Sequence, residues 1–194
     1  MRIISGIARG TRLVTLEGIE TRPTLDRVKE PLFSIIQMHI RGARVLDLFA
    51  GSGALGLEAL SRGAESAVFC DVSNKAINVI NQNIQKTKFT DKTRVFQESY
   101  EDVLKELAME NNNSVDGECT NVFDLIFLDP PYAGGMLENA IQSILDYNLL
   151  AEDGIIVVET DMESELKKLQ SIGLYVKDIR KYGRVILLFL EHKK

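Results

Sequence analysis

The stretch ARVLDLFAGSGALG, residues 43–56, decides the fold that this sequence predicts. Its first half is an apolar run typical of a buried strand, and residues 53–62 then have the apolar spacing of a short helix. Between them, Gly51, Gly53 and Gly56 fit the spacing G-x-G-x-x-G, in which glycines allow a tight turn and a close approach of backbone to a ligand. The stretch therefore predicts a strand, a ligand-binding turn and a helix in succession.

The same alternation continues along the chain. Further strands are predicted at 66–72, 93–99, 123–129 and 154–160, and helices at 74–88, 100–110, 136–147 and 163–172. Such alternation predicts a parallel sheet with helices on both faces. Residues 174–183 and 184–191 are two strand patterns too close together for a helical crossover, so we expect an antiparallel hairpin at the sheet edge.

The N-terminal residues differ from this pattern. The pattern of residues 1–16 indicates a small hairpin that turns near Ala8–Gly10. The extended segment after it leads into a helix that Thr24 could cap. Pro31 should kink this helix or mark a later start. Residues 110–121 read as a polar loop. We expect residues 1–40 to form an N-terminal hairpin and helix, and residues 41–194 to form the main domain.

Composition and charge narrow the class of protein. The chain has 194 residues, 45% of them apolar, and no apolar run near the ~20 residues of a membrane span. It begins without an apolar signal region, and its two cysteines have no CxxC partner, so we expect a cytoplasmic protein without a metal site. Residues 1–44 carry a net charge of +4 and the remainder −9. This asymmetry indicates either an anionic partner at the N-terminal segment or simply a solvated surface.

Acidic residues suggest which ligand the glycine loop holds. Asp71 follows Gly51 by 20 residues at the end of the next strand, where a carboxylate can bind both ribose hydroxyls, as in NAD-dependent oxidoreductases. Asp47, four residues before the first glycine, would repel a pyrophosphate. It suits S-adenosylmethionine, which has a ribose and an ammonium group but no phosphates.

The stretch FDLIFLDPPYAGG, residues 123–135, is an apolar strand that ends at a carboxylate, two prolines and a tyrosine. An exocyclic amine of a base is a poor nucleophile because its lone pair is delocalised into the ring. Two acceptors, Asp129 and the Pro130 carbonyl fixed by Pro131, can hold the amine hydrogens and aim that lone pair at a methyl donor. Tyr132 can stack on the base, which would have to be splayed out of its helix.

At these residues the sequence resembles class I S-adenosylmethionine-dependent methyltransferases with a Rossmann-like fold. The segment IISGIARGTRLVTLEGIETRPTLDRVKEPLFSII, residues 3–36, and KYGRVILLFLE, residues 181–191, are similar to the RsmD family, bacterial enzymes that form N2-methylguanine in small-subunit ribosomal RNA. The resemblance implies a seven-stranded mixed α/β sheet of strand order 3-2-1-4-5-7-6 with a small N-terminal β-hairpin extension. It also implies that the substrate is small-subunit (16S) ribosomal RNA or the assembling small subunit, and we expect the protein to be a monomer.

The resemblance implies roles for individual residues. The catalytic set is Asp129, Pro130, Pro131 and Tyr132. The set that binds S-adenosylmethionine is Asp47, Phe49, Gly51, Ser52, Gly53, Asp71, Glu98 and Ser99. The RNA-facing set is Arg9, Arg12, Arg22, Thr24 and Arg27.

Four alternatives remain at this stage. A DNA adenine or cytosine amine methyltransferase uses the same chemistry, and a protein glutamine methyltransferase shares the fold but usually has asparagine where Asp129 stands. An NAD-dependent oxidoreductase fits the glycine loop alone. A non-catalytic RNA-binding scaffold would not need both Asp129–Tyr132 and Gly51–Gly53.

Overall fold

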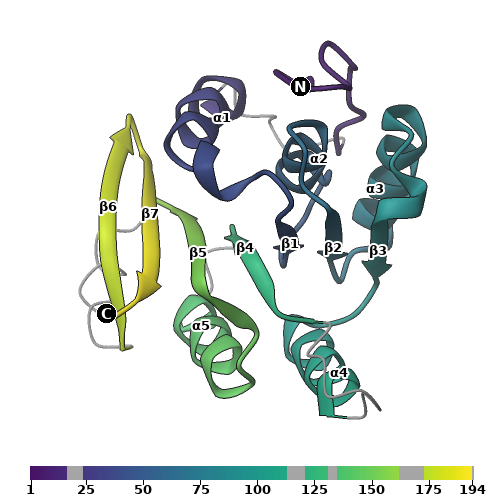
Figure 1. Ribbon diagram of the computed structural model, residues 1–194. Helices are drawn as coiled ribbons and strands as arrows, with labels where there is room; N and C mark the ends of the chain where they lie inside the picture. Colours follow the sequence, from purple (N-terminus) through teal and green to yellow (C-terminus); the bar gives the residue numbers. More distant parts are fainter. Residues whose placement is uncertain (17–23, 113–120, 131–134, 162–172, 194) are drawn as a thin grey trace.

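A computed structural model describes residues 1–16, 24–112, 121–130, 135–161 and 173–193. Seven strands form one sheet, whose bounds are β1 Arg44–Asp47, β2 Ser66–Cys70, β3 Thr93–Phe96, β4 Phe123–Leu128, β5 Leu150–Thr160, β6 Leu174–Tyr182 and β7 Val185–His192. Their order is β3-β2-β1-β4-β5-β7-β6, which confirms the predicted topology (Figure 1). The first five strands are parallel, and the β6–β7 hairpin joins β5 in the antiparallel sense.

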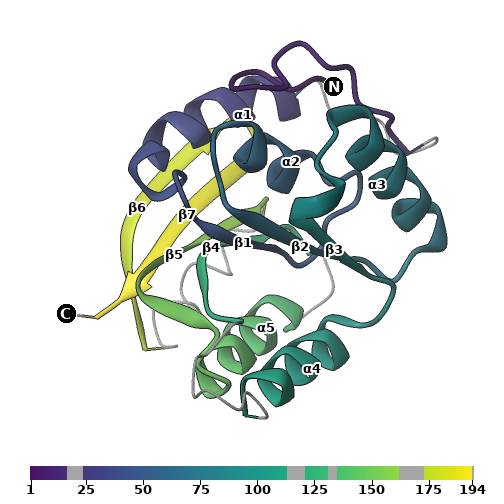
Figure 2. The same ribbon diagram turned by 45° about the vertical axis from the view of Figure 1, so that its right-hand side comes forward.

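Helices cover both faces of this sheet. Figure 2 shows α1 (Thr24–Ile35), α2 (Ala54–Ser61) and α3 (Asn74–Thr87) on one side, and α4 (Tyr100–Asn112) and α5 (Met136–Asp146) on the other. Two apolar clusters result, one for each face. Along β4, Leu125 and Phe127 belong to the cluster under α1–α3, whereas Ile126 and Leu128 belong to the cluster over α4 and α5. This alternation, the period of two of a strand, fixes which side chains face which layer.

Several strands differ in length from their predicted bounds, and β2 and β3 are shorter because the residues at their carboxyl ends leave the ladder. β2 ends at Cys70 and β3 at Phe96, so Asp71 and Glu98 lie in loops directly after their strands. β5 begins at Leu150, four residues earlier than predicted. Loops at the carboxyl ends of parallel strands are where α/β folds place ligands.

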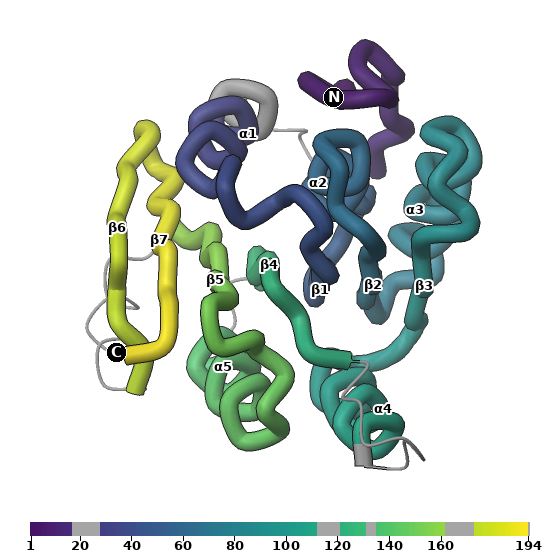
Figure 3. The backbone as a smooth tube through the Cα atoms, viewed as in Figure 1, coloured from purple at the N-terminus to yellow at the C-terminus, as the bar shows by residue number. Residues whose placement is uncertain are grey.

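The N-terminal residues form the expected hairpin. The Ile3 N–H donates to the Thr11 carbonyl at 3.0 Å, and the Gly10 N–H donates to the Ile3 carbonyl at 2.9 Å. Ile3 and Leu13 are buried in the cluster under α1–α3. The tube in Figure 3 shows this segment running along α2 toward α3. The division of the chain at residue 40 stays a prediction.

The first helix departs from expectation. α1 begins at Thr24 and includes Pro31, so Thr24 is helical rather than a cap, and a later start at the proline is wrong. Burial explains why the helix tolerates a missing backbone donor: Val28, Leu32 and Phe33 are each at most 2% exposed. α4 extends to Asn112 into the predicted loop, whose residues 113–120 lie outside the described residues, as does the whole helix predicted at 163–172.

Candidate active site

A cavity of about 650 Å³ lies at the carboxyl ends of the parallel strands. Seven of the eight predicted cofactor residues line it: Asp47, Phe49, Gly51, Ser52, Asp71, Glu98 and Ser99. Asp129 and Pro130 line the same cavity, so the described chain brings the two predicted sets together. Pro131 and Tyr132 lie outside the described residues.

The glycine loop is shaped by the helix that follows it. Gly53 adopts φ +73° immediately before α2, a conformation that glycine adopts without strain. At Gly56 an added Cβ would lie 2.4 Å from Cε1 of Phe69, so only glycine lets α2 pack this closely on β2. The third glycine of the motif therefore serves helix packing, and the first two shape the turn beside the cavity.

Asp47 is a buried carboxyl group at the end of β1. Its side chain is 3% exposed, and its Oδ2 accepts a hydrogen bond from the Gly56 N–H at 3.1 Å. Burial raises the pKa of Asp47 to about 7; the Gly56 N–H opposes this shift, and the negative charges of Asp129 and Asp71 add to it. A cationic group entering the cavity would stabilise the charged form of this carboxylate.

Asp71 joins the glycine loop to α3. Its Oδ2 accepts from the Gly51 N–H at 2.9 Å and its Oδ1 accepts from the Ser73 N–H at 2.8 Å. Ser73 in turn caps α3, and its side chain accepts from the Ala76 N–H. A carboxylate has about four acceptor sites, so Asp71 retains capacity to accept bonds from ligand hydroxyls.

Glu98 and Ser99 follow β3 and differ in their surroundings. The Ser99 hydroxyl donates to Asp102 Oδ2 at 2.8 Å and accepts from the Asp102 N–H, which places it at the start of α4. The Glu98 carbonyl accepts from the Cys70 thiol at 3.5 Å. Burial raises the pKa of Cys70 to about 12, with nearby carboxylates adding to the shift, so this thiol stays protonated and is not a nucleophile.

Asp129 and Asp47 lie on the same face of the sheet. Asp129 comes two positions after Phe127, which pairs with Asp47 between β4 and β1. Phe127 packs in the cluster under α1–α3, and Asp129, the first residue after β4, lies close enough for its charge to act on Asp47. Both carboxylates thus border the cavity from adjacent strands.

The RNA-facing set is only partly described. Arg9 and Arg12 are exposed on the hairpin, and Arg12 lies opposite Arg2 in an isolated antiparallel bridge. The hairpin turn at Arg9 packs near Ser61, at the end of α2 away from the glycine loop. Arg22 lies outside the described residues, and Thr24 and Arg27 belong to the first turns of α1.

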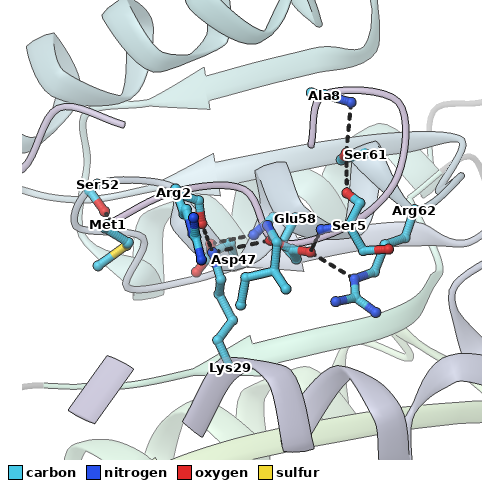
Figure 4. Close-up of polar contacts among 12 residues, drawn as sticks. Met1, Arg2, Ser5, Ala8, Lys29, Asp47, Ser52, Glu58, Ser61 and Arg62 are labelled. Atoms are coloured by element: carbon cyan, nitrogen blue, oxygen red, sulfur yellow. Dashed lines mark hydrogen bonds and ion pairs between the residues drawn. The ribbon is translucent and has the colours of Figure 1, made fainter. Parts of the chain in front are cut away.

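Sequence reasoning missed a buried ion pair beside the site. Lys29 of α1 and Glu58 of α2 lie 3.1 Å apart, with 2% and 0% of their side chains exposed. Lys29 also donates to the Arg2 carbonyl at 2.6 Å and lines the cavity. Glu58 accepts from the backbone N–H groups of Ile4 and Ser5, at 2.8 and 3.0 Å (Figure 4). The sequence sign of this pair was a charged glutamate within the mostly apolar helix ALGLEALS, which needs a partner once it is buried.

The N-terminal segment reaches the cavity through this cluster. Met1, Thr15 and Leu16 line the cavity wall, and Figure 4 shows Met1 beside Ser52 of the glycine loop. Asn83 of α3 holds the second hairpin strand, because its amide accepts from the Val14 N–H at 2.7 Å and donates to the Val14 carbonyl at 3.0 Å. The same amide donates to the Ser52 carbonyl at 2.9 Å, so one side chain joins the hairpin to the glycine loop.

The described part of the chain contains neither a candidate metal-binding group nor a candidate membrane-spanning helix. Its His, Cys, Asp and Glu side chains form no group of three or more that could hold a metal ion. None of the helices within the described ranges combines the length and apolar character of a membrane span.

Comparisons with known proteins agree with this arrangement. YlbH of Bacillus subtilis is 42% identical over 166 residues, covering 86% of this chain and 85% of the relative. The ribosomal RNA small subunit methyltransferase D of Haemophilus influenzae is 36% identical over 167 residues, covering 86% and 81%. The structure of yhhF from Escherichia coli matches with a TM-score of 0.82 and 31% identity, covering 100% of this chain and 99% of that one.

A family model described as conserved hypothetical protein 95 matches residues 1–191, nearly the whole chain. The ribosomal RNA small subunit methyltransferase D from Escherichia coli is 35% identical over 166 residues, covering 86% of this chain and 77% of the relative. The chain therefore belongs to this family, the RsmD family.

Proposed function

We propose that this protein transfers a methyl group from S-adenosylmethionine to the exocyclic N2 amine of a guanine in small-subunit (16S) ribosomal RNA. One observation carries the proposal: a single cavity is lined both by the glycine loop with Asp47 and Asp71 and by Asp129 with Pro130. The names of the relatives from Haemophilus influenzae and Escherichia coli support ribosomal RNA as the substrate.

The cavity presents carboxylate acceptors that suit the ammonium and ribose groups of S-adenosylmethionine. Asp47 is a buried acceptor able to bind an ammonium group, and Asp71 is a carboxylate after β2 with capacity for ribose hydroxyls. Phe49, Gly51 and Ser52 line the wall between them, Gly53 follows in the same turn, and Glu98 and Ser99 line the wall after β3. When bound, S-adenosylmethionine supplies a methyl group on a positively charged sulfur and leaves as S-adenosylhomocysteine.

Asp129 and Pro130 act on the base. The Asp129 carboxylate and the Pro130 carbonyl each accept one hydrogen of the amine, which aims the nitrogen lone pair at the methyl group. The amine becomes acidic as the new carbon–nitrogen bond forms, so a strong base is not needed before attack. Its proton then passes to Asp129 or to water. Pro131 fixes the acceptor carbonyl, and Tyr132 stacks on the base and holds its plane.

The basic residues of the N-terminal segment support an RNA partner. Exposed Arg9 and Arg12, with Arg22, Thr24 and Arg27 in the same N-terminal segment, face the RNA backbone. We expect the substrate to be ribosomal RNA alone or within the assembling small subunit, and the enzyme to act as a cytoplasmic monomer.

The variant Asp129→Ala tests the proposal. Because it removes an acceptor used only on the amine, we expect methylation of unmodified small-subunit ribosomal RNA to fall roughly 100- to 1,000-fold. Titration calorimetry should find S-adenosylhomocysteine binding changed by less than about threefold, because the cofactor contacts remain. The exposed Asp146→Ala is the matched control and should leave both quantities unchanged.

Nucleoside mass spectrometry of the product identifies the methylated base. N2-methylguanosine is expected, whereas N6-methyladenosine or N4-methylcytidine would indicate a different amine. A thermal-shift comparison of S-adenosylhomocysteine with NAD separates the oxidoreductase alternative. Methylation by Asp129→Ala at the wild-type rate would exclude the proposed chemistry.

A further inference from the structure

Glu159 is an acidic residue near the end of β5 that the proposed chemistry has not used. It is 8% exposed and lines the same cavity as Asp129 and Asp47. Two positions earlier on β5, Val157 packs in the cluster under α1–α3. The alternation of the strand therefore directs Glu159 to the face that carries Asp47 and Asp129.

The register of the sheet places Glu159 beside Asp129. Leu128, the last residue of β4, pairs with Val158 of β5, and Asp129 and Glu159 are the residues that directly follow this pair. Adjacent strands lie about 4.8 Å apart. In the sheet order β1-β4-β5, the carboxylates therefore follow one another as Asp47, Asp129 and Glu159.

This order separates two ends of the cavity. The residues proposed to bind the cofactor follow β1, β2 and β3, on one side of Asp129. Glu159 lies on the other side, on β5. If Asp129 acts on the amine, the base extends away from the cofactor toward Glu159.

The chemistry of guanine matches this position. Next to the N2 amine, guanine presents N1–H, which is a donor. Next to their own amines, adenine and cytosine present unprotonated ring nitrogens, which are acceptors. A carboxylate is an acceptor only, so it pairs with the guanine edge and is repelled by the other two. With about four acceptor sites, Glu159 can bind a base in addition to its contacts within the protein.

We propose that Glu159 accepts a hydrogen bond from guanine N1–H and so determines which base the cavity admits. This inference rests on the proposed function, since it assigns the base specificity of the same reaction. A site built to bind a substrate N–H rejects analogues that lack it, because the protein acceptor then stays unpaired in the cavity. Glu159 would act as a specificity residue, while Asp129 and Pro130 position the amine.

The variant Glu159→Gln and the base 2-aminopurine test this assignment together. 2-Aminopurine keeps the 2-amine but has an unprotonated N1. The methylated nucleotide is first mapped with wild-type enzyme, and transcripts are then made with guanine or 2-aminopurine at that position. We expect the wild type to prefer guanine at least 100-fold in kcat/KM.

For E159Q we expect the preference for guanine to fall roughly 10- to 100-fold. Its amide can donate to N1 of 2-aminopurine, so activity on that base should rise while activity on guanine falls. Glu159→Ala should lose activity on guanine without gaining it on 2-aminopurine. Glu152→Gln, an exposed acid-to-amide change on the same strand, is the matched control and should keep the wild-type preference.

Calorimetry with S-adenosylhomocysteine completes the test. Unchanged affinity in E159Q together with the altered base preference supports the inference. Retained guanine preference, or a loss of S-adenosylhomocysteine affinity that accounts for the whole effect, overturns it. An inactive wild type, or a wild-type product other than N2-methylguanosine, would instead overturn the proposed function.

Discussion

Asp47 shows how one residue couples proton binding to ligand binding. Burial raises its pKa to about 7, far above the usual range of an aspartate. Above that pH the protein holds a buried negative charge, whose carboxylate accepts a hydrogen bond from the Gly56 N–H. A ligand ammonium group would compensate this charge, so binding should lower the pKa of Asp47 and release a proton.

We therefore predict that S-adenosylhomocysteine affinity depends on pH near neutrality. Between pH 6 and 7 the affinity of the wild type should rise by up to about tenfold as Asp47 ionises. Above about pH 8 the affinity should fall again, because the amino group of the ligand loses its proton. Titration calorimetry in buffers of different ionisation enthalpy would measure both the affinity and the proton released.

Asp47→Asn is the control for this pH dependence. The variant should bind weakly and lack the rise between pH 6 and 7. The raised pKa means that the folded protein prefers protonated Asp47. The stability that this preference contributes is fully present below the unfolded pKa of about 3.8 and is lost as pH rises through about 7. The unliganded variant should thus be more stable than the wild type at pH 8. A wild-type affinity that stays flat over this range would contradict the assignment of Asp47.

At the scale of elements, Glu58 connects three segments. The glutamate lies in α2, its ion-pair partner Lys29 in α1, and the N–H donors of Ile4 and Ser5 in the hairpin. Arg62, at the end of α2, forms a further ion pair with Glu58 at 2.8 Å. All of these contacts converge on a carboxylate with no exposed surface, where an unpaired charge is costly.

We predict that Glu58→Ala lowers the free energy of unfolding by about 3–5 kcal/mol, because it leaves Lys29 charged and buried. Lys29→Met should have a similar effect by leaving Glu58 without its ammonium partner. The double variant Lys29→Met/Glu58→Leu should be less destabilised than the sum of the two single changes. Urea unfolding at constant m-value measures these differences.

Glu65→Ala is the matched control, since this glutamate is exposed and should change stability by less than about 0.5 kcal/mol. An exactly additive double variant would mean that the ion pair contributes no coupling energy. Proteolysis of the N-terminal hairpin offers a second readout, and Glu58→Ala should be cleaved there faster than the wild type.

At the scale of the molecule, the exposed arginines of the hairpin contrast with an acidic remainder. The whole chain carries −5, yet residues 1–44 carry +4. Arg2 and Arg12 lie directly opposite each other in the bridge, a like-charge arrangement that destabilises an isolated hairpin. A polyanion across this surface would relieve the repulsion.

We predict that replacing Arg2, Arg9 and Arg12 by glutamine weakens RNA binding in a salt-dependent way. Each lost phosphate contact should reduce the slope of log K against log salt by about 0.7–0.9, or by roughly 2–3 for all three. Affinity for S-adenosylhomocysteine should not change, because none of these side chains lines the cavity. Equal salt slopes for the variant and the wild type would exclude the hairpin as an RNA contact.

Much of the fold could be predicted because local patterns agree with the tertiary structure. The helix that begins at Asn74, the apolar strand before the glycine loop and the β6–β7 hairpin all depend on short-range preferences. The sequence left open whether the first helix begins before Pro31 or at it. The helix includes Pro31, because burial of its apolar face outweighs the missing backbone donor. Local preference is a weak guide wherever packing offers more free energy than one hydrogen bond.

The sequence by itself determined that Asp47, the glycine loop, Asp71 and Asp129 share one edge, because parallel strands joined by crossover helices present all their carboxyl ends together. Only the tertiary structure decided that Glu159 lines the same cavity as Asp129, that Lys29 and Glu58 pair, and that Met1 reaches the glycine loop. These contacts depend on strand register and on helix packing between distant segments. Burial, which sets the pKa of Asp47, likewise exists only once the layers have assembled.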